Sequence, residues 1–481
     1  MELPLEVLSQ WASIPSKKQY ISTQNSKPQE SHKPPTITSK SCGNPSDQTV
    51  DIEELGNTVP KELLEPSSSA SSDSGVEFTK KYNDAQLVEK FKDSEQMIEP
   101  VLRETLTKQG YKLVGSHSSI KMCRWTKSML RGQGGCYNFF SKNTPINYSK
   151  IRKVSPKFFC YKNTFYNIAS HRCMESTPNL ACANKCVFCW RHQRNPTGTE
   201  WKWKLDDAEQ VFKGMLKNHY QMIKEAKGIP GVTEESMKEA MKLGHIALSL
   251  VGEPIMYPQI DKFLRLCHEN HVSTFLVTNG SFPERIKSIM QICQLYLSVD
   301  ASTEENHKKV DKPLFKDGWK RFLQAVDNLA QRKERTVFRL TMVKGWNDEE
   351  LEQYAKLTLR GDPDFIEVKG VTYCGTNWAG NTEDNTVLGL KNVPFHEEVI
   401  MFCERLEELL DYKYEIASEH EHSNCIMLAK KEKFFIDGCW HTHIDFEKFH
   451  QLATSGKPFT ALDYRFFYKQ RILMKFDKFF C

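Results

Sequence analysis

The sequence predicts an α/β fold with a parallel, barrel-like sheet and a disordered N-terminal tail. In the second half of the chain, short apolar runs alternate with helical stretches, which is typical of a parallel sheet covered by helices. These runs end in glycine or polar residues, and in barrel-like α/β folds the ligand and catalytic groups collect at that end of the strands. The first 95 residues, in contrast, lack a pattern that could form a core.

The N-terminal segment, residues 1–95, is expected to be disordered. Ser, Thr, Pro, Gln and Lys dominate Ser13–Lys40, and Pro66–Ser74 reads PSSSASSDS. A segment of this composition buries too little apolar surface to offset the entropy that it loses on ordering. We expect order to begin near Gln96, with a short helix over Glu99–Gly110 that Gly110 terminates.

Residues 96–180 are expected to form a basic, cysteine-rich segment. Between Arg103 and Asn195 the chain carries 17 Lys and Arg against two acids, whereas the net charge of the whole chain is only +5. A segment this one-sided, rich in aromatics and glycine, more often binds a polyanion than faces solvent. We therefore expect a nucleic-acid partner.

Residues 181–415 are expected to form the barrel. A helix is predicted over Asp206–Ala226, with Asp206 as its N-cap. Strand-like runs follow at His245–Val251, Thr274–Thr278, Leu295–Asp300, Val337–Val343 and Phe365–Val371. Helical stretches lie between and after them at Tyr257–His271, Pro283–Ile292, Lys316–Arg332, Asp348–Leu359 and Pro394–Leu410. Two more strand-like runs complete the pattern, Lys413–Ser418 and Asn424–Ala429.

The 15 cysteines favour metal or redox chemistry over a disulfide framework. No apolar run approaches the roughly 18 residues that a membrane span needs, and the first residues lack the pattern of a signal peptide. We therefore expect a cytoplasmic protein that does not associate with a membrane. Cys267, Cys293 and Cys403 lie in apolar patterns and are expected to be buried core residues. Seven of the cysteines, however, fall within the 67 residues from Cys123 to Cys189.

The clearest chemical motif is the triplet Cys182, Cys186 and Cys189, spaced C-x3-C-x2-C. Three thiolates on one loop can each bind one iron of a [4Fe–4S] cluster and leave the fourth iron without a protein ligand. That iron can chelate the amino and carboxylate groups of S-adenosylmethionine (SAM), and an electron from the cluster can then release a 5′-deoxyadenosyl radical. Zinc is the alternative, with His192 as a fourth ligand, although structural zinc sites normally close with cysteine pairs.

Residues at the ends of three strand-like runs favour a SAM site. Gly252 would let a ligand approach the backbone, and Glu253 could accept hydrogen bonds from the SAM ammonium group. Ser298 and Asp300 could contact the ribose or the methionine of SAM; alternatively, Asp300 only caps the segment that follows. The expected cofactor-binding residues are Gly252, Glu253, Pro254, Thr278, Asn279, Ser298 and Asp300.

Longer stretches resemble the tRNA 4-demethylwyosine synthases, the radical SAM enzymes of wybutosine biosynthesis. Strings this long, spread from about residue 99 to 450, are more specific than the cysteine triplet. They are Cys123–Ser128, His171–Glu175, Ala181–His192, Gly198–Trp201, Leu248–Pro258, Ser298–Thr303, Phe365–Gly375 and Ser418–Cys425.

The resemblance implies a fold, a reaction and its substrates. The fold is a partial (β/α)6 radical SAM barrel. The implied substrates are pyruvate and a tRNA-Phe that carries N1-methylguanosine at position 37. By analogy, the adenosyl radical abstracts hydrogen from the N-methyl group, and the resulting carbon radical adds to pyruvate with loss of the carboxyl carbon. The product would be 4-demethylwyosine, and the enzyme would be classed as a carbon–carbon lyase.

The resemblance also implies a second [4Fe–4S] cluster, bound by three upstream cysteines thirteen residues apart. A lysine two residues after the middle cysteine would form a Schiff base with pyruvate. Here Cys123 and Cys136 are thirteen apart, as are Cys160 and Cys173, while the 24 residues from Cys136 to Cys160 look inserted. Either Cys136 or Cys160 could be the middle ligand. We favour Cys160, because Lys162 follows it by two residues.

The expected second ligand set is therefore Cys123, Cys160 and Cys173, with Lys162 as the catalytic residue. Imine chemistry requires that burial or nearby cations lower the pKa of Lys162, and the surrounding Arg and Lys residues are expected to do so. Alternatively, Lys162 contacts phosphate.

Residues 416–481 are expected to form a wyosine-type element that faces tRNA. Phe446–Cys481 carries ten aromatics, seven Lys and Arg and three acids, and aromatic and basic side chains can stack and bind unpaired bases. Alternatively, this stretch is an amphipathic tail packed on the barrel.

Eukaryotic members of the family usually begin with a flavodoxin-like domain that binds FMN. Residues 1–95 are too few and too polar for one, so we expect a separate electron-donor protein and a monomeric enzyme. Three other hypotheses remain: another radical SAM enzyme that modifies RNA, such as a methyltransferase or methylthiotransferase; a zinc-stabilised RNA-binding protein; and a degenerate family member that binds tRNA without converting it.

Overall fold

The computed structural model describes residues 83–131, 160–190, 194–374 and 388–467, which belong to one structural unit. Residues 1–82 and residues 136–159, which begin with Cys136, lie outside the described residues. The expected end of the disordered tail at residue 95 was wrong. Helix α2 (Asp84–Lys90) begins with a capping box from Asn83, and its Leu87 and Val88 pack against the main core.

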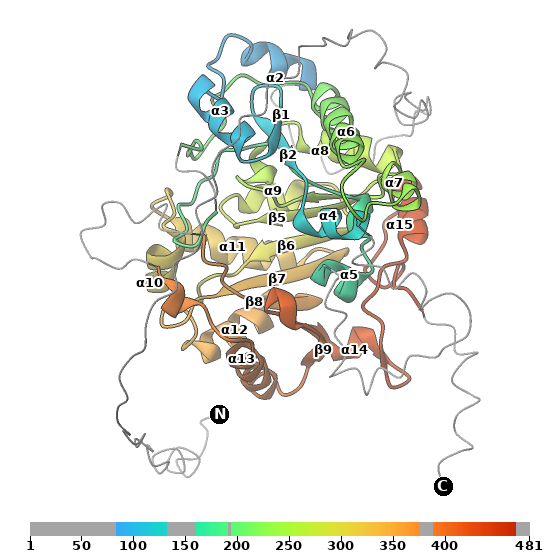
Figure 1. Cartoon of the computed structure of the whole chain (residues 1–481). Helices are drawn as coiled ribbons and strands as arrows, with labels where there is room; N and C mark the ends of the chain where they lie inside the picture. Colours follow the sequence, from blue (N-terminus) through green and yellow to red (C-terminus); the bar gives the residue numbers. More distant parts are fainter. Residues whose placement is uncertain (1–82, 132–159, 191–193, 375–387, 468–481) are drawn as a thin grey trace, which may run out of the picture. The chain divides into compact units, whose positions relative to one another are not determined.

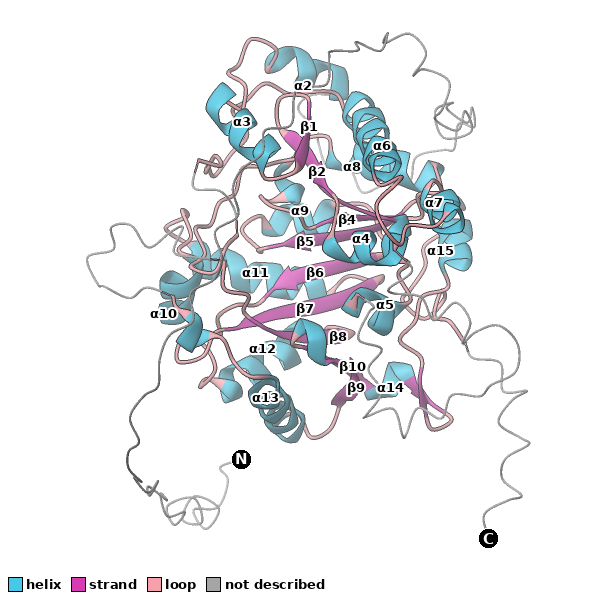
Figure 2. Ribbon diagram, in the orientation of Figure 1, coloured by secondary structure: helices cyan, strands magenta, loops and turns pink. Residues whose placement is uncertain are grey.

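A ten-stranded mixed sheet organises the described chain, in the order β1-β2-β3-β4-β5-β6-β7-β8-β10-β9 (Figures 1 and 2). The strands β3 to β8 run parallel to one another, whereas β1, β2, β9 and β10 extend the two sides in antiparallel fashion. The parallel strands are β3 (Cys173–Thr177), β4 (His245–Leu248), β5 (Ser273–Thr278), β6 (Gln294–Ser298), β7 (Arg335–Met342) and β8 (Phe365–Gly370). The others are β1 (Tyr111–Val114), β2 (Ser118–Lys121), β9 (Tyr414–His420) and β10 (Cys425–Lys430).

Six parallel strands, each followed by helix, confirm the expected partial (β/α)6 barrel. The helices that follow them are α6 (Ala208–Glu225) and α7 (Glu234–Ala240), α8 (Ile260–Glu269), α9 (Pro283–Ser288), α11 (Gly318–Ala330), α12 (Leu351–Gly361) and α13 (His396–Leu409). Strands β4 to β8 match the expected strand-like runs. All of these helices except α7 match the expected helical stretches. One detail was wrong: Asp207, not Asp206, caps α6, since the Asp207 side chain accepts the Glu209 N–H, and Asp206 accepts the N–H of Ser116 instead.

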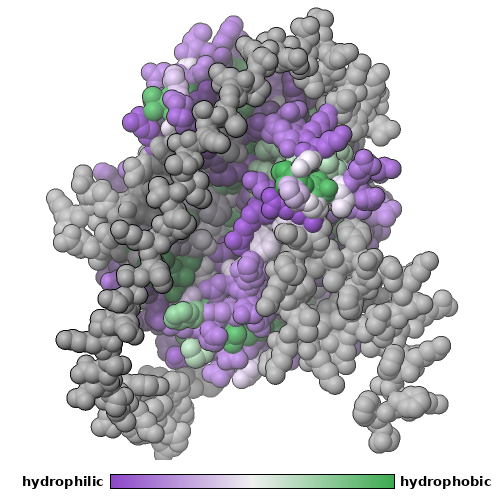
Figure 3. Space-filling view, viewed as in Figure 1, coloured by the Kyte–Doolittle hydropathy of each residue, from purple (hydrophilic) through white to green (hydrophobic). Residues whose placement is uncertain are grey.

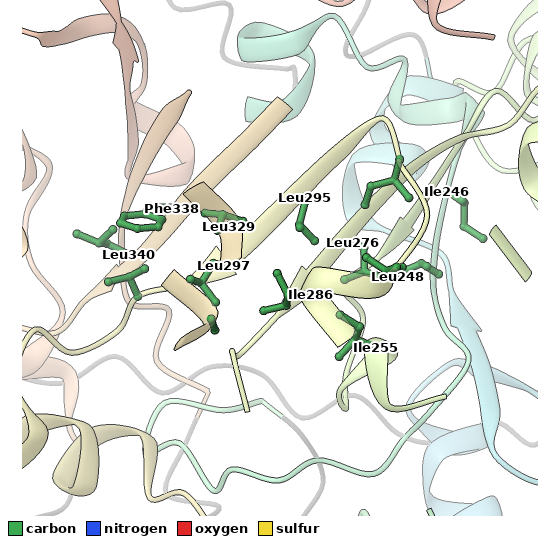
Figure 4. Close-up of a cluster of buried hydrophobic side chains, with 14 of the residues drawn as sticks. Ile246, Leu248, Ile255, Leu276, Ile286, Leu295, Leu297, Leu329, Phe338 and Leu340 are labelled. Carbon is green, nitrogen blue, oxygen red and sulfur yellow. The ribbon is translucent and has the colours of Figure 1, made fainter. Parts of the chain in front are cut away.

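The main core lies between the outer face of the sheet and these helices. Alternate residues of each strand point outward, such as Ile246 and Leu248 on β4 and Leu295 and Leu297 on β6, and all four are fully buried. Figure 4 shows them meeting Ile255, Ile286 and Leu329 from the covering segments. The three cysteines expected in the core are buried as predicted, at Cys267, Cys293 and Cys403.

A second core fills the inner face at the end where the parallel strands begin, which we call the amino edge. Helix α5 (Tyr161–Tyr166) contributes Phe165 and Tyr166, and helix α15 (Phe446–Thr454) contributes Phe449. The segment after α15 adds Tyr464, whose hydroxyl accepts the N–H of Arg335 at the start of β7 (3.0 Å). The opposite carboxyl edge, where the strands end, is left for the functional site.

None of the helices in these ranges is long and apolar enough to cross a membrane. Where described residues are visible, the face shown in Figure 3 is largely hydrophilic, with small apolar patches.

Candidate active site

The loop that carries Cys182, Cys186 and Cys189 follows β3 and is held at the carboxyl edge by backbone hydrogen bonds. Its main anchor is the helical turn η7 (His307–Asp311), which follows β6. Within these contacts, the Val187 N–H donates to the Val310 carbonyl (2.9 Å) and the Lys185 N–H to the Asp311 carbonyl (3.1 Å). The loop position is thus fixed by backbone pairing rather than by the cysteine side chains.

The thiols of this loop share one environment. The Cys186 thiol donates to Asp311 Oδ1 (3.4 Å), and burial, with the neighbouring Asp311, Cys189 and Cys182, raises its pKa well above the ordinary value. The Cys182 Sγ accepts N–H groups from the Asn184 backbone (3.5 Å) and the Asn279 side chain (3.4 Å). Across the described ranges, no three His, Cys, Asp or Glu side chains converge closely enough to hold a metal ion as they stand.

These residues fit an iron–sulfur cluster. Three thiols lie on one loop, and the amide donors around Cys182 are of the kind that stabilise cluster sulfurs. His192, the possible fourth zinc ligand, lies outside the described residues.

Gly252 lies where the turn after β4 meets the segment that leads into the cysteine loop. It adopts φ +76°, and a Cβ atom there would lie 2.1 Å from the carbonyl oxygen of Asn179. The glycine therefore lets the protein's own backbone approach closely, just before the cysteine loop. The Glu253 N–H donates to the Ala181 carbonyl (2.8 Å), and the Asn179 side chain donates to the Glu253 carbonyl (2.8 Å).

The carboxyl group of Glu253 is buried, and only one of its two oxygens accepts a hydrogen bond within the described chain. Its Oε2 accepts the backbone N–H of Asn279 (2.8 Å), while Oε1 has no hydrogen-bond partner in the described chain. Burial raises the pKa of Glu253 to about 7, against the opposing effect of the hydrogen bond from Asn279. An unpaired buried oxygen beside the cysteine loop fits a donor such as the SAM ammonium group.

The other expected SAM contacts surround Glu253 at the carboxyl edge. Pro254 begins the short helix η6 (Pro254–Met256), Thr278 ends β5, and Ser298 ends β6. Asp300 uses Oδ1 to accept the backbone N–H of Thr341 on the neighbouring strand β7 (2.8 Å), so it links β6 to β7 rather than capping the segment that follows it. Burial raises the pKa of Asp300 to about 6.

A second group of predicted residues meets around one small cavity of about 40 Å³ on the inner face of the sheet. Its lining includes Cys123, Cys160, Lys162 and Cys173. Cys123 precedes helix α4 (Arg124–Leu130), Cys160 precedes α5, and Cys173 begins β3, so three separate elements bring the thiols together. The rival ligand, Cys136, lies outside the described residues.

Glu175 belongs to this cavity, although it was not expected there. It lies two residues after Cys173 on the same face of β3, and burial raises its pKa. Burial alone would lower the pKa of Lys162, but Tyr161, Cys173 and Glu175 outweigh that effect and raise it. The expectation that surrounding cations lower the pKa of Lys162 was therefore wrong for the protein without its clusters.

A polar network on strands β7 and β8 adjoins this cavity. Arg339 forms an ion pair with Glu367 on the neighbouring strand, and its Nη1 donates to the Tyr161 hydroxyl (3.1 Å). The Tyr166 hydroxyl donates to the other oxygen of Glu367 (2.7 Å). The signal in the sequence was a charged residue inside each of two apolar strand runs.

The chain matches two protein families at the positions of these elements. Residues 177–358, from the end of β3 to α12, match the radical SAM superfamily. Residues 360–430, which carry β8, β9 and β10, match the wyosine base formation family.

Proteins similar over most of this chain are tRNA-modifying enzymes. The chain is 51% identical over 428 residues to the S-adenosyl-L-methionine-dependent tRNA 4-demethylwyosine synthase of Xenopus laevis, which covers 88% of this chain and 53% of that protein. It is 53% identical over 374 residues to the Homo sapiens enzyme, which covers 76% of this chain and 47% of that protein. The chain thus spans about half the length of these relatives.

Solved structures agree with this likeness. A structure of TYW1 with a lysine–pyruvate adduct bound shares 28% sequence identity with the chain at a TM-score of 0.56, and covers 70% of this chain and 97% of its own. The crystal structure of an archaeal TYW1 shares 27% identity at a TM-score of 0.53, and covers 72% and 100% respectively. The chain is therefore a homologue of the tRNA 4-demethylwyosine synthases, with the radical SAM and wyosine base formation domains in sequence.

Proposed function

We propose that this chain is a radical SAM enzyme that condenses pyruvate with N1-methylguanosine at position 37 of tRNA-Phe to form 4-demethylwyosine. The observation that carries the proposal is the cavity on the inner face of the sheet. It gathers Cys123, Cys160 and Cys173 around Lys162, in a homologue of synthases for one of which a lysine–pyruvate adduct is described. The loss of the carboxyl carbon of pyruvate would make the reaction that of a carbon–carbon lyase.

The proposal includes two cofactor sites. Cys182, Cys186 and Cys189 would hold one [4Fe–4S] cluster, and Cys123, Cys160 and Cys173 a second. When bound, the first cluster and SAM would supply the radical that removes hydrogen from the N-methyl group. Glu253 would receive the SAM ammonium group at its unpaired Oε1.

Lys162 would capture pyruvate at its carbonyl carbon. The neutral amine attacks C2, the carbonyl oxygen leaves as water, and an imine joins Nζ to C2. Lys162 must lose a proton first, and Glu175 lines the same cavity as a buried acceptor. Because the cavity lies inside the sheet, bulk water has little access to hydrolyse the imine.

The proposal also predicts the macromolecules with which the enzyme interacts. The basic residues between Arg103 and Asn195 would contact tRNA-Phe phosphates. A separate protein would donate electrons, and the enzyme would act as a monomer in the cytoplasm. The tRNA-facing role expected for residues 416–481 needs its own test, because the described part after Thr442 packs at the amino edge.

The first test is mass spectrometry of nucleosides from tRNA-Phe that carries N1-methylguanosine. Anaerobic incubation with reconstituted protein, SAM, pyruvate and a chemical reductant should yield a tricyclic base, and the base should be absent without pyruvate. Lys162→Met should abolish the product, while the exposed control Lys356→Met should not. A brown protein that cleaves SAM but leaves the nucleoside unchanged would refute the synthase function.

A further inference from the structure

We propose that Arg339 binds the carboxylate of the 2-oxo acid that Lys162 captures, and thereby selects an acid over a neutral ketone. The inference rests on the proposed function, because it concerns the small substrate of the same site. It assigns a role to a residue that lies outside the cysteine motifs, in the middle of strand β7.

Tyr161 connects Arg339 to the lysine. The Lys162 Nζ lies 6.0 Å from the centroid of the Tyr161 ring, and the Arg339 Cζ lies 5.1 Å from the same centroid. The Tyr161 hydroxyl accepts a hydrogen bond from Arg339 Nη1 (3.1 Å). The amine and the guanidinium thus lie beside the same ring, and the proposed substrate would extend from the first to the second.

The guanidinium of Arg339 is only partly used by the protein. In the described chain its hydrogen bonds to Glu367 and Tyr161 both come from Nη1, which leaves Nε and Nη2 without one. Glu367 has no oxygen to spare for another cation, because Tyr166 occupies Oε1. Two parallel N–H groups with fixed geometry are what a carboxylate binds best.

The charge around Arg339 is not balanced within the strands. Lys369 follows Glu367 by two residues and points to the same face of β8. Its Nζ donates to the Thr372 hydroxyl (2.9 Å) and the Gly370 carbonyl (3.1 Å), and it has no ion-pair partner among the residues that the structure describes. Burial and then Arg339 lower the pKa of Lys369 to about 8. Strands β7 and β8 therefore place two cations, Arg339 and Lys369, near one carboxylate, Glu367. A bound anion would balance the excess positive charge.

Recognition at this position would also orient the substrate. A carboxylate held by Arg339 fixes the plane of the acid, so that C2 faces Lys162 across the edge of Tyr161. A neutral ketone would form the imine without this restraint and at higher concentration. A purely structural ion pair would change stability but would not discriminate between the two.

The test is reductive trapping of the imine in the purified full chain, without tRNA. Protein is incubated with pyruvate or with its neutral methyl ester and cyanoborohydride, and peptide mass spectrometry measures adduct on Lys162 against concentration. Because hydrogen bonds between charged groups contribute about 1.5–3 kcal/mol, the wild type should be half-modified at a pyruvate concentration about tenfold or more below that of the ester. The double variant Arg339→Gln/Glu367→Gln, which removes both partners of the buried ion pair, should lose this preference for pyruvate.

Three further variants separate binding from folding. Glu367→Gln alone keeps the guanidinium and should retain or strengthen the preference for pyruvate. Arg339→Lys should recover part of the preference, because it restores charge but not the paired donors. Arg360→Gln removes an exposed arginine paired with Asp327 and should behave as wild type.

The outcomes distinguish this inference from the proposed function. A double variant that is folded by circular dichroism and still prefers pyruvate as the wild type does would overturn the role of Arg339 and leave the Lys162 imine intact. Should the double variant not fold, an unchanged preference in Arg339→Lys together with a lost preference in Glu367→Gln would overturn it as well. A wild type that forms no Lys162 adduct with either compound would instead remove the imine from the proposed function, and the inference with it.

Discussion

Glu253 links the protonation of one buried carboxyl to the stability of the whole fold. Burial raises its pKa to about 7 from the ordinary value of 4.5. Between these two values the folded state holds a proton that the unfolded state has released, so stability falls as the pH rises through that window. SAM would reverse this effect, since an ammonium group beside Oε1 favours the charged carboxylate.

We therefore expect Glu253→Gln to remove part of the pH dependence of stability in the protein without cofactors. Relative to the wild type, the variant should gain on the order of 2–3 kcal/mol in the free energy of unfolding between about pH 5 and about pH 8. Urea unfolding at several pH values measures this. The exposed Glu104→Gln should leave the pH dependence unchanged, and equal slopes for Glu253→Gln and the wild type would show that the buried carboxyl is already ionised at pH 5.

At the scale of single elements, the turn that follows β4 joins the expected SAM site to the cysteine loop. Gly252 lets this turn approach the backbone of residues 179–181, which leads directly into Cys182. Two hydrogen bonds across this contact then fix the loop relative to the sheet: the Glu253 N–H donates to the Ala181 carbonyl, and the Asn179 side chain donates to the Glu253 carbonyl. The turn thus supports the cluster ligands without containing one.

Gly252→Ala should destabilise the fold by roughly 2–4 kcal/mol, because it combines a steric clash with a left-handed backbone. Chemical denaturation measures the loss, and iron content after reconstitution measures its effect on the loop. Gly345→Ala controls for the backbone alone, since Gly345 has φ +74° but nothing within 4 Å of an added Cβ. Gly389 has neither a left-handed backbone nor an atom within 4 Å of an added Cβ, so Gly389→Ala should leave the stability nearly unchanged. A Gly252→Ala variant no less stable than Gly345→Ala would contradict the close approach.

The parallel strands that the sequence predicted are those in which most residues of the expected run are apolar. Strands β4 to β8 read as apolar runs because helices cover one face and the inner core the other. Strand β3 was missed, because its inner-facing positions include Cys173 and Glu175, which line a site rather than a core. The triplet Cys182, Cys186 and Cys189 was found through its spacing, whereas Cys123, Cys160, Cys173 and Lys162 were expected from the resemblance to the family. The partners that set the electrostatics of Lys162, above all Glu175 and Tyr161, depend on contacts between separate elements that no local pattern encodes.

At the scale of the whole described unit, the two edges of the sheet have different tasks. The carboxyl edge carries the cysteine loop and Glu253, while the amino edge is closed by the segment that includes α15. Phe446 packs on His245 at the start of β4 (ring centroids 4.3 Å apart), and Tyr464 bonds to the backbone where β6 and β7 begin. Aromatic residues that predicted base stacking from sequence therefore contribute, in residues 446–464, to a core.

Phe449→Ala tests whether this segment supports the fold or the binding of tRNA. Phe449 is fully buried against Phe459 and Tyr464, so its truncation should lower the free energy of unfolding by about 3–5 kcal/mol. At low temperature, where the variant stays folded, its affinity for tRNA-Phe in a filter-binding assay should equal that of the wild type. Phe467→Ala, at an exposed position, should change stability by about 0.5 kcal/mol or less. A stable Phe449→Ala variant with weakened tRNA binding would instead place the nucleic acid at the amino edge. Loss of the Phe449 ring would then lower the affinity for tRNA rather than the free energy of unfolding.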